Sequence, residues 1–216
     1  MIPLLEVESV SAGYGGDTIL KEVSLSLESG DVIGLVGRNG SGKSTFLHTI
    51  VGLTQISHGS IRFRGHEIHR LKPRQILAKG IAYASQKDAI FPELSVVENL
   101  DISILLTGSR GANSRQEREE ALLNFPSLQK FRYSPAKALS GGMQKILSLA
   151  MALQQNPHFL MLDEPSVGLD KRALVQIEEQ INNLKVNGAG LIIVEHNQDF
   201  LRSVANTILT VDDGMI

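Results

Sequence analysis

One stretch of the chain has the residue types and spacing that bind phosphate groups. It reads Gly37-Arg38-Asn39-Gly40-Ser41-Gly42-Lys43-Ser44-Thr45. Its glycines let the backbone turn tightly, so that successive N–H groups can point at an anion. Lys43 would reach the β- and γ-phosphates of a nucleotide, and the Ser44 hydroxyl would bind Mg²⁺. The alternative is a glycine-rich turn before an ordinary helix, but the complete G-x4-G-K-S pattern favours a nucleoside triphosphate site.

An acidic pair further along the chain could complete that chemistry. Asp163-Glu164 directly follows the apolar run Phe159–Leu162. A hydrolysing nucleotide site needs a metal ion, a positioned water and neutralisation of charge on the γ-phosphoryl group. Asp163 would hold its carboxylate near Mg²⁺, usually through water, and Glu164 would polarise the attacking water. The alternative is two acidic residues that simply end a strand.

The elements that must position these residues are strands and helices in alternation. The apolar run Val32–Val36 precedes the phosphate loop, and a helical pattern from Phe46 to Val51 follows it. Phe159–Leu162 and Leu191–Val194 are typical of further buried strands, the second of which leads into Glu195-His196. This order predicts a parallel α/β sheet, and ligands bind beyond the carboxyl ends of its strands.

Two other parts of the chain have different patterns. Apolar and polar residues alternate in Leu5–Val10, in Glu22–Glu28 and around Ile61, which predicts antiparallel β structure with an edge strand at residues 60–64. Between the first two strands, residues 13–17 read as a loop that carries Tyr14. From about residue 88 to 155 the patterns are helical, beginning with a capping box of Ser95 and Glu98.

Composition excludes several kinds of protein. The 216 residues carry a formal net charge of −2, so no global positive field attracts nucleic acid or anionic lipid. A basic stretch at residues 62–79 lacks interleaved aromatic residues and reads as a solvated face. The absence of cysteine excludes disulfides and thiolate metal sites. Neither a signal peptide nor a run of about 20 apolar residues is evident, so a membrane role would require a partner.

The segment Leu139-Ser140-Gly141-Gly142 connects these features to a known family. With this segment, the chain resembles the ATP-binding subunits of ABC transporters over essentially its whole length. The other matching motifs are the phosphate loop (Walker A), residues 159–164 (Walker B), residues 166–170 (D-loop) and His196 (H-loop). Residues 139–144 would be the family's signature. Their Ser-Gly-Gly also suits a second anion-binding helix N-terminus, the alternative being an ordinary helix cap.

The resemblance implies roles for residues that carry weak signals alone. Tyr14 would stack on adenine, Gln86 would join the Mg²⁺ and water shell, and His196 would contact the γ-phosphate. Asp170 would act across a dimer interface. The alternatives are a tyrosine packed on its neighbours and a histidine in a local hydrogen bond. Met143, Met151 and Ser85 depart from the residues common in the family without removing a phosphate contact.

The resemblance also implies a fold and a working assembly. The expected fold is an α/β P-loop NTPase core with a mainly parallel sheet, an N-terminal antiparallel β subdomain and a helical subdomain inserted at about 88–155. Two ATPase subunits, identical or paralogous, would bind ATP and Mg²⁺ between them. A transmembrane permease would dock near Phe91–Leu100, holding the protein at the cytoplasmic face of the membrane, with no nucleic acid involved.

Three functional hypotheses follow. The first is an ATPase that powers a transporter; Phe125-Pro126-Ser127-Leu128 and Val194-Glu195-His196-Asn197 resemble importers of branched-chain amino acids, and residues 86–100 a lipopolysaccharide exporter. The second is a soluble ABC ATPase acting on nucleic acid or ribosomes, which would be expected to have tandem motifs or a long coiled-coil insertion. The third is a nucleotide-gated scaffold that binds without hydrolysing, which Glu164 argues against.

Overall fold

A computed structural model describes residues 2–85, 90–106 and 114–216. In this part of the chain, five strands form a parallel sheet. In spatial order they are β6 (Ile81–Ala84), β7 (Phe159–Asp163), β8 (Gly190–Val194), β3 (Val32–Val36) and β9 (Thr207–Thr210). Every residue of β7 and β8 is buried. Strands covered on both faces need apolar side chains throughout, which explains their continuous apolar runs.

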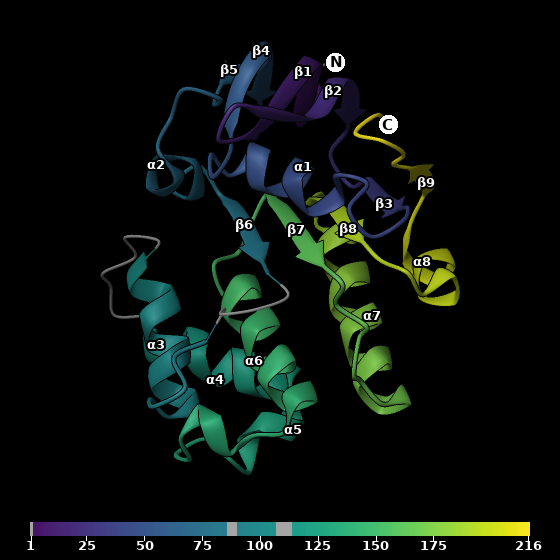
Figure 1. Cartoon of the computed structure of the whole chain (residues 1–216). Coiled ribbons are helices and arrows are strands. Elements are labelled where there is room, and N and C mark those ends of the chain that lie inside the picture. Colours follow the sequence, from purple (N-terminus) through teal and green to yellow (C-terminus); the bar gives the residue numbers. More distant parts are fainter. Residues whose placement is uncertain (1, 86–89, 107–113) are drawn as a thin grey trace.

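A second sheet is antiparallel and lies beside the first (Figure 1). Its order is β2 (Asp17–Leu27), β1 (Leu5–Tyr14), β4 (Gln55–Phe63) and β5 (His66–Glu67). Two sequence-based expectations were wrong here. Residues 60–64 do not form an edge strand, because β4 pairs with both β1 and β5. Tyr14 is not in a loop: it ends β1 opposite Asp17, across a two-residue turn.

Helix α1 (Lys43–Ile50) joins the two sheets. Phe46, Leu47 and Ile50 are buried in a hydrophobic cluster that also contains side chains from β1, β3 and β7. Gly52, with φ +77°, follows the end of the helix, where a left-handed residue is favourable. Because α1 begins inside the phosphate loop, this packing fixes the loop against both sheets.

The remaining helices lie beside the sheets or together at one end of the molecule (Figure 1). Helices α3 to α6 are the group at that end. The predicted capping box is present at the start of α3, where Glu98 accepts a hydrogen bond from Ser95 N at 2.7 Å. The helices are α2 (Pro73–Leu77), α3 (Val96–Leu106), α4 (Ser114–Asn124), α5 (Pro126–Gln129), the 3-10 turn η1 (Ala136–Ala138), α6 (Gly141–Leu153), α7 (Lys171–Val186) and α8 (Gln198–Val204).

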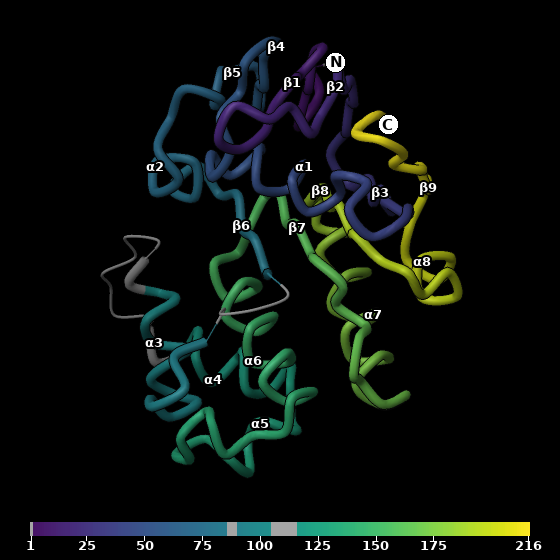
Figure 2. Tube along the Cα trace, viewed as in Figure 1, coloured from purple at the N-terminus to yellow at the C-terminus, as the bar shows by residue number. Residues whose placement is uncertain are grey.

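This topology brings three loops to one place. The strand order puts β8 between β7 and β3, and the three strands are parallel. The loops that leave their carboxyl ends begin at Gly37, Glu164 and Glu195. The C-terminal residues also run past this region beside β2 (Figure 2), where Gly214 N donates to Ser41 O at 3.0 Å. The sheet thus brings the phosphate loop, the acidic pair and His196 to the same end of neighbouring strands.

Candidate functional site

The phosphate loop has backbone conformations that require glycine. Gly37 has φ +155° and Gly42 has φ +107°. A Cβ atom on Gly37 would lie 2.2 Å from Val211 O, which no side chain could tolerate. The chain therefore turns tightly just before the N-terminus of α1. Backbone N–H groups at a helix N-terminus and the positive end of the helix dipole favour the binding of an anion.

Lys43 lies across this loop. Its Nζ donates to Gly37 O at 2.8 Å and to Arg38 O at 2.9 Å, and the residue is only 6% exposed. Burial lowers the pKa of Lys43, while the charges of Glu164 and Asp163 oppose that shift. Ser41 Oγ is buried without a hydrogen-bond partner among the described residues. A confined cation and an unpaired hydroxyl fit a ligand that carries phosphate oxygens.

The acidic pair at the end of β7 reaches the same edge. Asp163 is buried, and Glu164 has φ +51°, a left-handed conformation that costs energy in a residue with a side chain. Glu164 N donates to Val194 O at 2.8 Å, which fixes the strained residue against β8. Glu164 Oε1 lies 3.4 Å from His196 Nε2. The structure therefore brings Glu164 and His196 together, as predicted for residues that serve one reaction.

Two residues that the sequence analysis did not single out support this arrangement. Glu195 is fully buried, and its carboxylate accepts from Ser166 N at 2.7 Å, His196 N at 2.7 Å and Asn197 N at 3.0 Å. Lys145 on α6 donates to Glu164 O and Val167 O. These contacts connect distant segments, and only the position of Glu195 at a strand end gave a signal.

The Ser-Gly-Gly segment begins α6. Ser140 is the N-cap, and its Oγ accepts from Met143 N at 3.3 Å. Ser140 and Gly141 are exposed, and Gly142 lies beside Gly168, where an added Cβ would be 3.0 Å from Gly168 O. Among the residues that the structure describes, no hydrogen bond joins this segment to residues 37–45. Within one chain these two predicted anion sites are not brought into contact.

The other predicted residues have varied surroundings. Tyr14 is 43% exposed, and its hydroxyl lies 2.8 Å from His48 Nδ1 on α1. Asp170 is exposed and caps α7 by accepting from Ala173 N at 2.9 Å. Asn39 and Gly40 are exposed on the phosphate loop. Gln86 lies outside the described residues.

The donors at this edge suit a hard cation held partly by phosphate. Across the described ranges, no three histidine, cysteine or acidic side chains gather as a metal site. Mg²⁺ in phosphoryl-transfer sites is held by one or two protein oxygens together with water and substrate phosphates. Ser44 on α1 and Asp163 at the end of β7 would supply such oxygens. The residues therefore fit the predicted cation.

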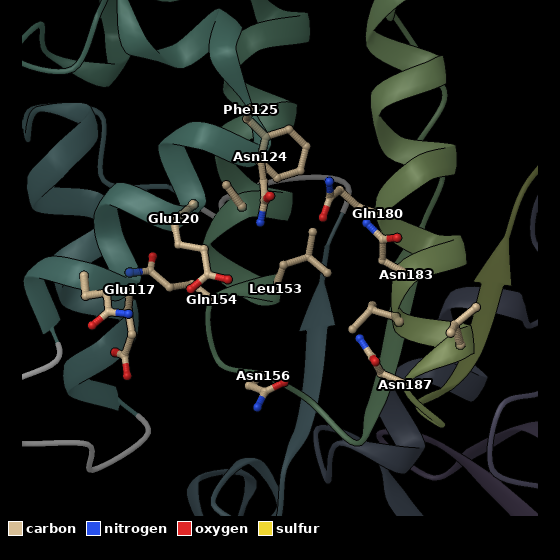
Figure 3. Close-up of a pocket in the computed structure, with 15 residues that line it drawn as sticks. Glu117, Glu120, Asn124, Phe125, Leu153, Gln154, Asn156, Gln180, Asn183 and Asn187 are labelled. Carbon is tan, nitrogen blue, oxygen red and sulfur yellow. The ribbon is translucent and has the colours of Figure 1, made fainter.

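A separate polar cleft of about 620 Å³ lies between α4, the end of α6 and α7. Figure 3 shows Glu120 and Asn124 on one side and the amides of Gln180 and Asn183 on the other, with Leu153 between them. Amide and carboxylate side chains carry no positive charge that could bind a phosphate group. None of the residues that line this cleft belongs to the predicted nucleotide site. The candidate site is therefore the sheet edge and not this cleft.

Comparison with known proteins indicates the family of the chain. A family model described as "ABC transporter" matches residues 20–167. The lipopolysaccharide export ATP-binding protein LptB of Escherichia coli (strain K12) is 31% identical over 97% of this chain and 87% of its own. The high-affinity branched-chain amino acid transport ATP-binding protein BraG of Pseudomonas aeruginosa is 34% identical over 99% of this chain and 91% of its own.

Solved structures give the same result. An ATP-binding subunit of an ABC transporter has a TM-score of 0.90 and 27% identity, covering 99% of this chain and 88% of its own. The ADP conformation of an ATP-binding cassette of an ABC transporter has a TM-score of 0.84 and 28% identity, covering 100% of this chain and 90% of its own.

Proposed function

The chain belongs to the ABC transporter family, and we propose that it hydrolyses ATP between two copies of the protein to power a membrane transporter. Membership makes it an ATP-binding ATPase subunit. One observation supports the residue assignment above the others: Glu164 and His196 lie 3.4 Å apart at the sheet edge where the Lys43 loop also begins.

Each residue then has a distinct part in hydrolysis. The loop N–H groups and Lys43 hold the β- and γ-phosphates. Ser44 and Asp163 would hold Mg²⁺, which would supply positive charge next to the phosphate oxygens. Glu164 accepts a proton from the water that attacks the γ-phosphorus, and the bond to the β-phosphate oxygen breaks to leave ADP. His196, in contact with Glu164, would hold the γ-phosphoryl oxygens.

A phosphate-release assay on the purified chain tests this function. We expect Mg²⁺-dependent release of phosphate from ATP, with a loss of at least about 100-fold in Lys43→Ala because the charge on the phosphates is no longer neutralised. Lys185→Ala, at a half-buried position on α7 outside the phosphate loop, is the matched control and should retain activity. ATP binding without any phosphate release would instead support the nucleotide-gated scaffold.

A small difference in identity between two relatives supports one direction of transport over the other. BraG is 34% identical over 213 residues, whereas LptB is 31% identical over 210 residues. We therefore propose import of amino acids or similar small solutes, with lipopolysaccharide export as the second candidate because the LptB match also spans nearly the whole chain. Copurification of the permease from native membranes, followed by its identification, distinguishes the two.

The link to the membrane would be a permease. Across the described ranges, the helices are too short or too polar to serve as a bilayer span. Phe91 is 46% exposed and precedes α3, so an apolar side chain is available for contact at the predicted docking position. Buried Asn99 holds the backbone there, because its side chain accepts from Phe91 N at 2.7 Å and donates to Phe91 O at 3.0 Å. Docking here would place the protein at the cytoplasmic face.

Phe91→Ala should reduce binding to membranes that contain the permease by about tenfold. Truncating an aromatic side chain that becomes buried on binding costs about 1 to 2 kcal/mol of binding free energy or more. The folded ATPase should be unaffected, since the ring is not part of the hydrophobic core. Membrane flotation and thermal unfolding measure the two effects. Tyr133→Ala, which removes another exposed ring, is the control. Unfolding of Phe91→Ala, or unchanged membrane binding by the folded variant, would contradict docking at Phe91.

A further inference from the structure

A line of hydrogen-bonding side chains runs from the end of β1 to the end of β7. Tyr14 Oη lies 2.8 Å from His48 Nδ1, and His48 Nε2 lies 3.2 Å from Tyr83 Oη. Tyr83 Oη in turn donates to Asp163 Oδ2 at 3.4 Å. The rings of His48 and Tyr83 also meet edge to face, with centroids 5.8 Å apart. Both nitrogens of one imidazole are thus engaged, each by a different tyrosine.

The chemistry of Asp163 sets the direction of these hydrogen bonds. An ionised carboxylate can only accept, so the Tyr83 hydroxyl must donate to it. Tyr83 Oη then accepts from His48 Nε2–H. A neutral imidazole protonated at Nε2 has a lone pair at Nδ1, which accepts the hydrogen bond from Tyr14.

We propose that His48 is a positioning residue that couples the adenine end of the nucleotide site to its Mg²⁺ end. The inference rests on the proposed function, in which Tyr14 stacks on adenine and Asp163 serves Mg²⁺. His48 touches neither group. It acts through Tyr14 and, by way of Tyr83, through Asp163.

The physical basis is the ordering of the two ends. Tyr14 is 43% exposed, and a hydrogen bond at its hydroxyl holds the ring in place while part of its surface remains available for stacking. At the other end, Tyr83 occupies Asp163 Oδ2 and thereby orients the carboxylate. A ligand that fixes either end strengthens the intervening bonds and reduces the entropy lost in fixing the other. Such coupling must act equally in both directions.

Calorimetric titration can measure this coupling without turnover. The probes are the β,γ-imido analogue of ATP and inorganic triphosphate, which lacks the base, each with Mg²⁺ and with EDTA. For each probe, the effect of Mg²⁺ is the ratio of the affinity with Mg²⁺ to the affinity with EDTA. In the wild type this ratio should be about two- to tenfold larger for the analogue than for triphosphate. That difference is the range expected for one neutral hydrogen bond. In His48→Phe the two ratios should be equal.

Further variants separate coupling from damage to the fold. Tyr14→Phe keeps the ring and removes only the hydroxyl, so it should also equalise the two ratios. Combining it with His48→Phe should add nothing, because both changes break the same hydrogen bond. His66→Phe makes the same substitution at an exposed position on β5 and should behave as the wild type. Thermal unfolding checks that each variant is folded.

A spectroscopic measurement on the nucleotide-free protein tests the geometry independently. Long-range ¹H–¹⁵N correlation should show His48 as the neutral tautomer protonated at Nε2. The Nδ1-protonated tautomer, equal Mg²⁺ ratios in the wild type, or an undiminished difference in both His48→Phe and Tyr14→Phe would overturn the coupling. Failure of the wild type to bind either probe would overturn the proposed function as well.

Discussion

Replacing Glu164 by glutamine will reduce ATP turnover by roughly 100- to 10,000-fold, the usual contribution of a general base, while ATP binding persists. The amide keeps the size of the side chain but cannot accept a proton from the attacking water. Phosphate release and equilibrium binding of ATP measure the two effects. Because hydrolysis no longer consumes the nucleotide, the ATP complex should persist as a dimer on gel filtration.

The control for this substitution is Glu179→Gln. Glu179 is exposed on α7, so the same chemical change there should leave turnover and binding unaltered. Glu164 also has a left-handed backbone, and thermal unfolding should show that Glu164→Gln, which keeps that backbone and its bond to Val194, remains folded. Near-normal hydrolysis by Glu164→Gln would remove Glu164 from its assigned role.

The second large effect is recovery of activity on mixing two inactive variants. Ser140→Arg places a bulky cation at the exposed start of α6, and Lys43→Ala removes the charge from the phosphate loop. If the two copies pair head to tail, as we propose, each nucleotide would lie between the loop of one copy and the Ser140 segment of the other. A mixed dimer then has one intact site and one doubly altered site. Recovery should reach roughly half of wild-type activity per mixed dimer if the sites are independent, and less if they are coupled.

A different mixture shows whether recovery depends on opposite halves of a shared site. Lys43→Ala and Glu164→Gln both alter the half-site that contains the phosphate loop. Each site of their mixed dimer therefore carries one lesion, and activity should not return. Recovery in this control, measured as phosphate release after mixing at equal concentration, would contradict a site shared between two chains.

Much of the parallel sheet could be predicted from the sequence, because its strands are short apolar runs with polar residues or glycine at their ends. The apolar run Val32–Val36 is β3 with the same bounds, and Leu191–Val194 lies within β8. The antiparallel sheet was harder to predict, because alternation shows that one face is buried but not which neighbours a strand pairs with. This is why β4 was mistaken for an edge strand and Tyr14 was assigned to a loop.

The phosphate loop and the acidic pair could be found because their chemistry depends on local spacing. Their supporting residues could not be found in that way. Lys145 contacts carbonyl oxygens that lie 19 and 22 residues away, and His48 joins Tyr14 and Tyr83, which lie 34 and 35 residues away in opposite directions. These contacts depend on the packing of α1 and α6 against the sheets. A histidine or lysine on a helix gives no such information by itself.

Crosslinking between two cysteines tests the shared site most directly. The chain contains no cysteine, so Asn39→Cys and Ser140→Cys introduce the only thiols. Asn39 is exposed on the phosphate loop, whereas Ser41 beside it is 7% exposed and would be a poor choice. With ATP bound in the Glu164→Gln background, a short thiol-specific reagent should produce a covalent dimer, and omission of ATP should abolish it. Crosslinks confined to single chains, with ATP bound, would contradict the account.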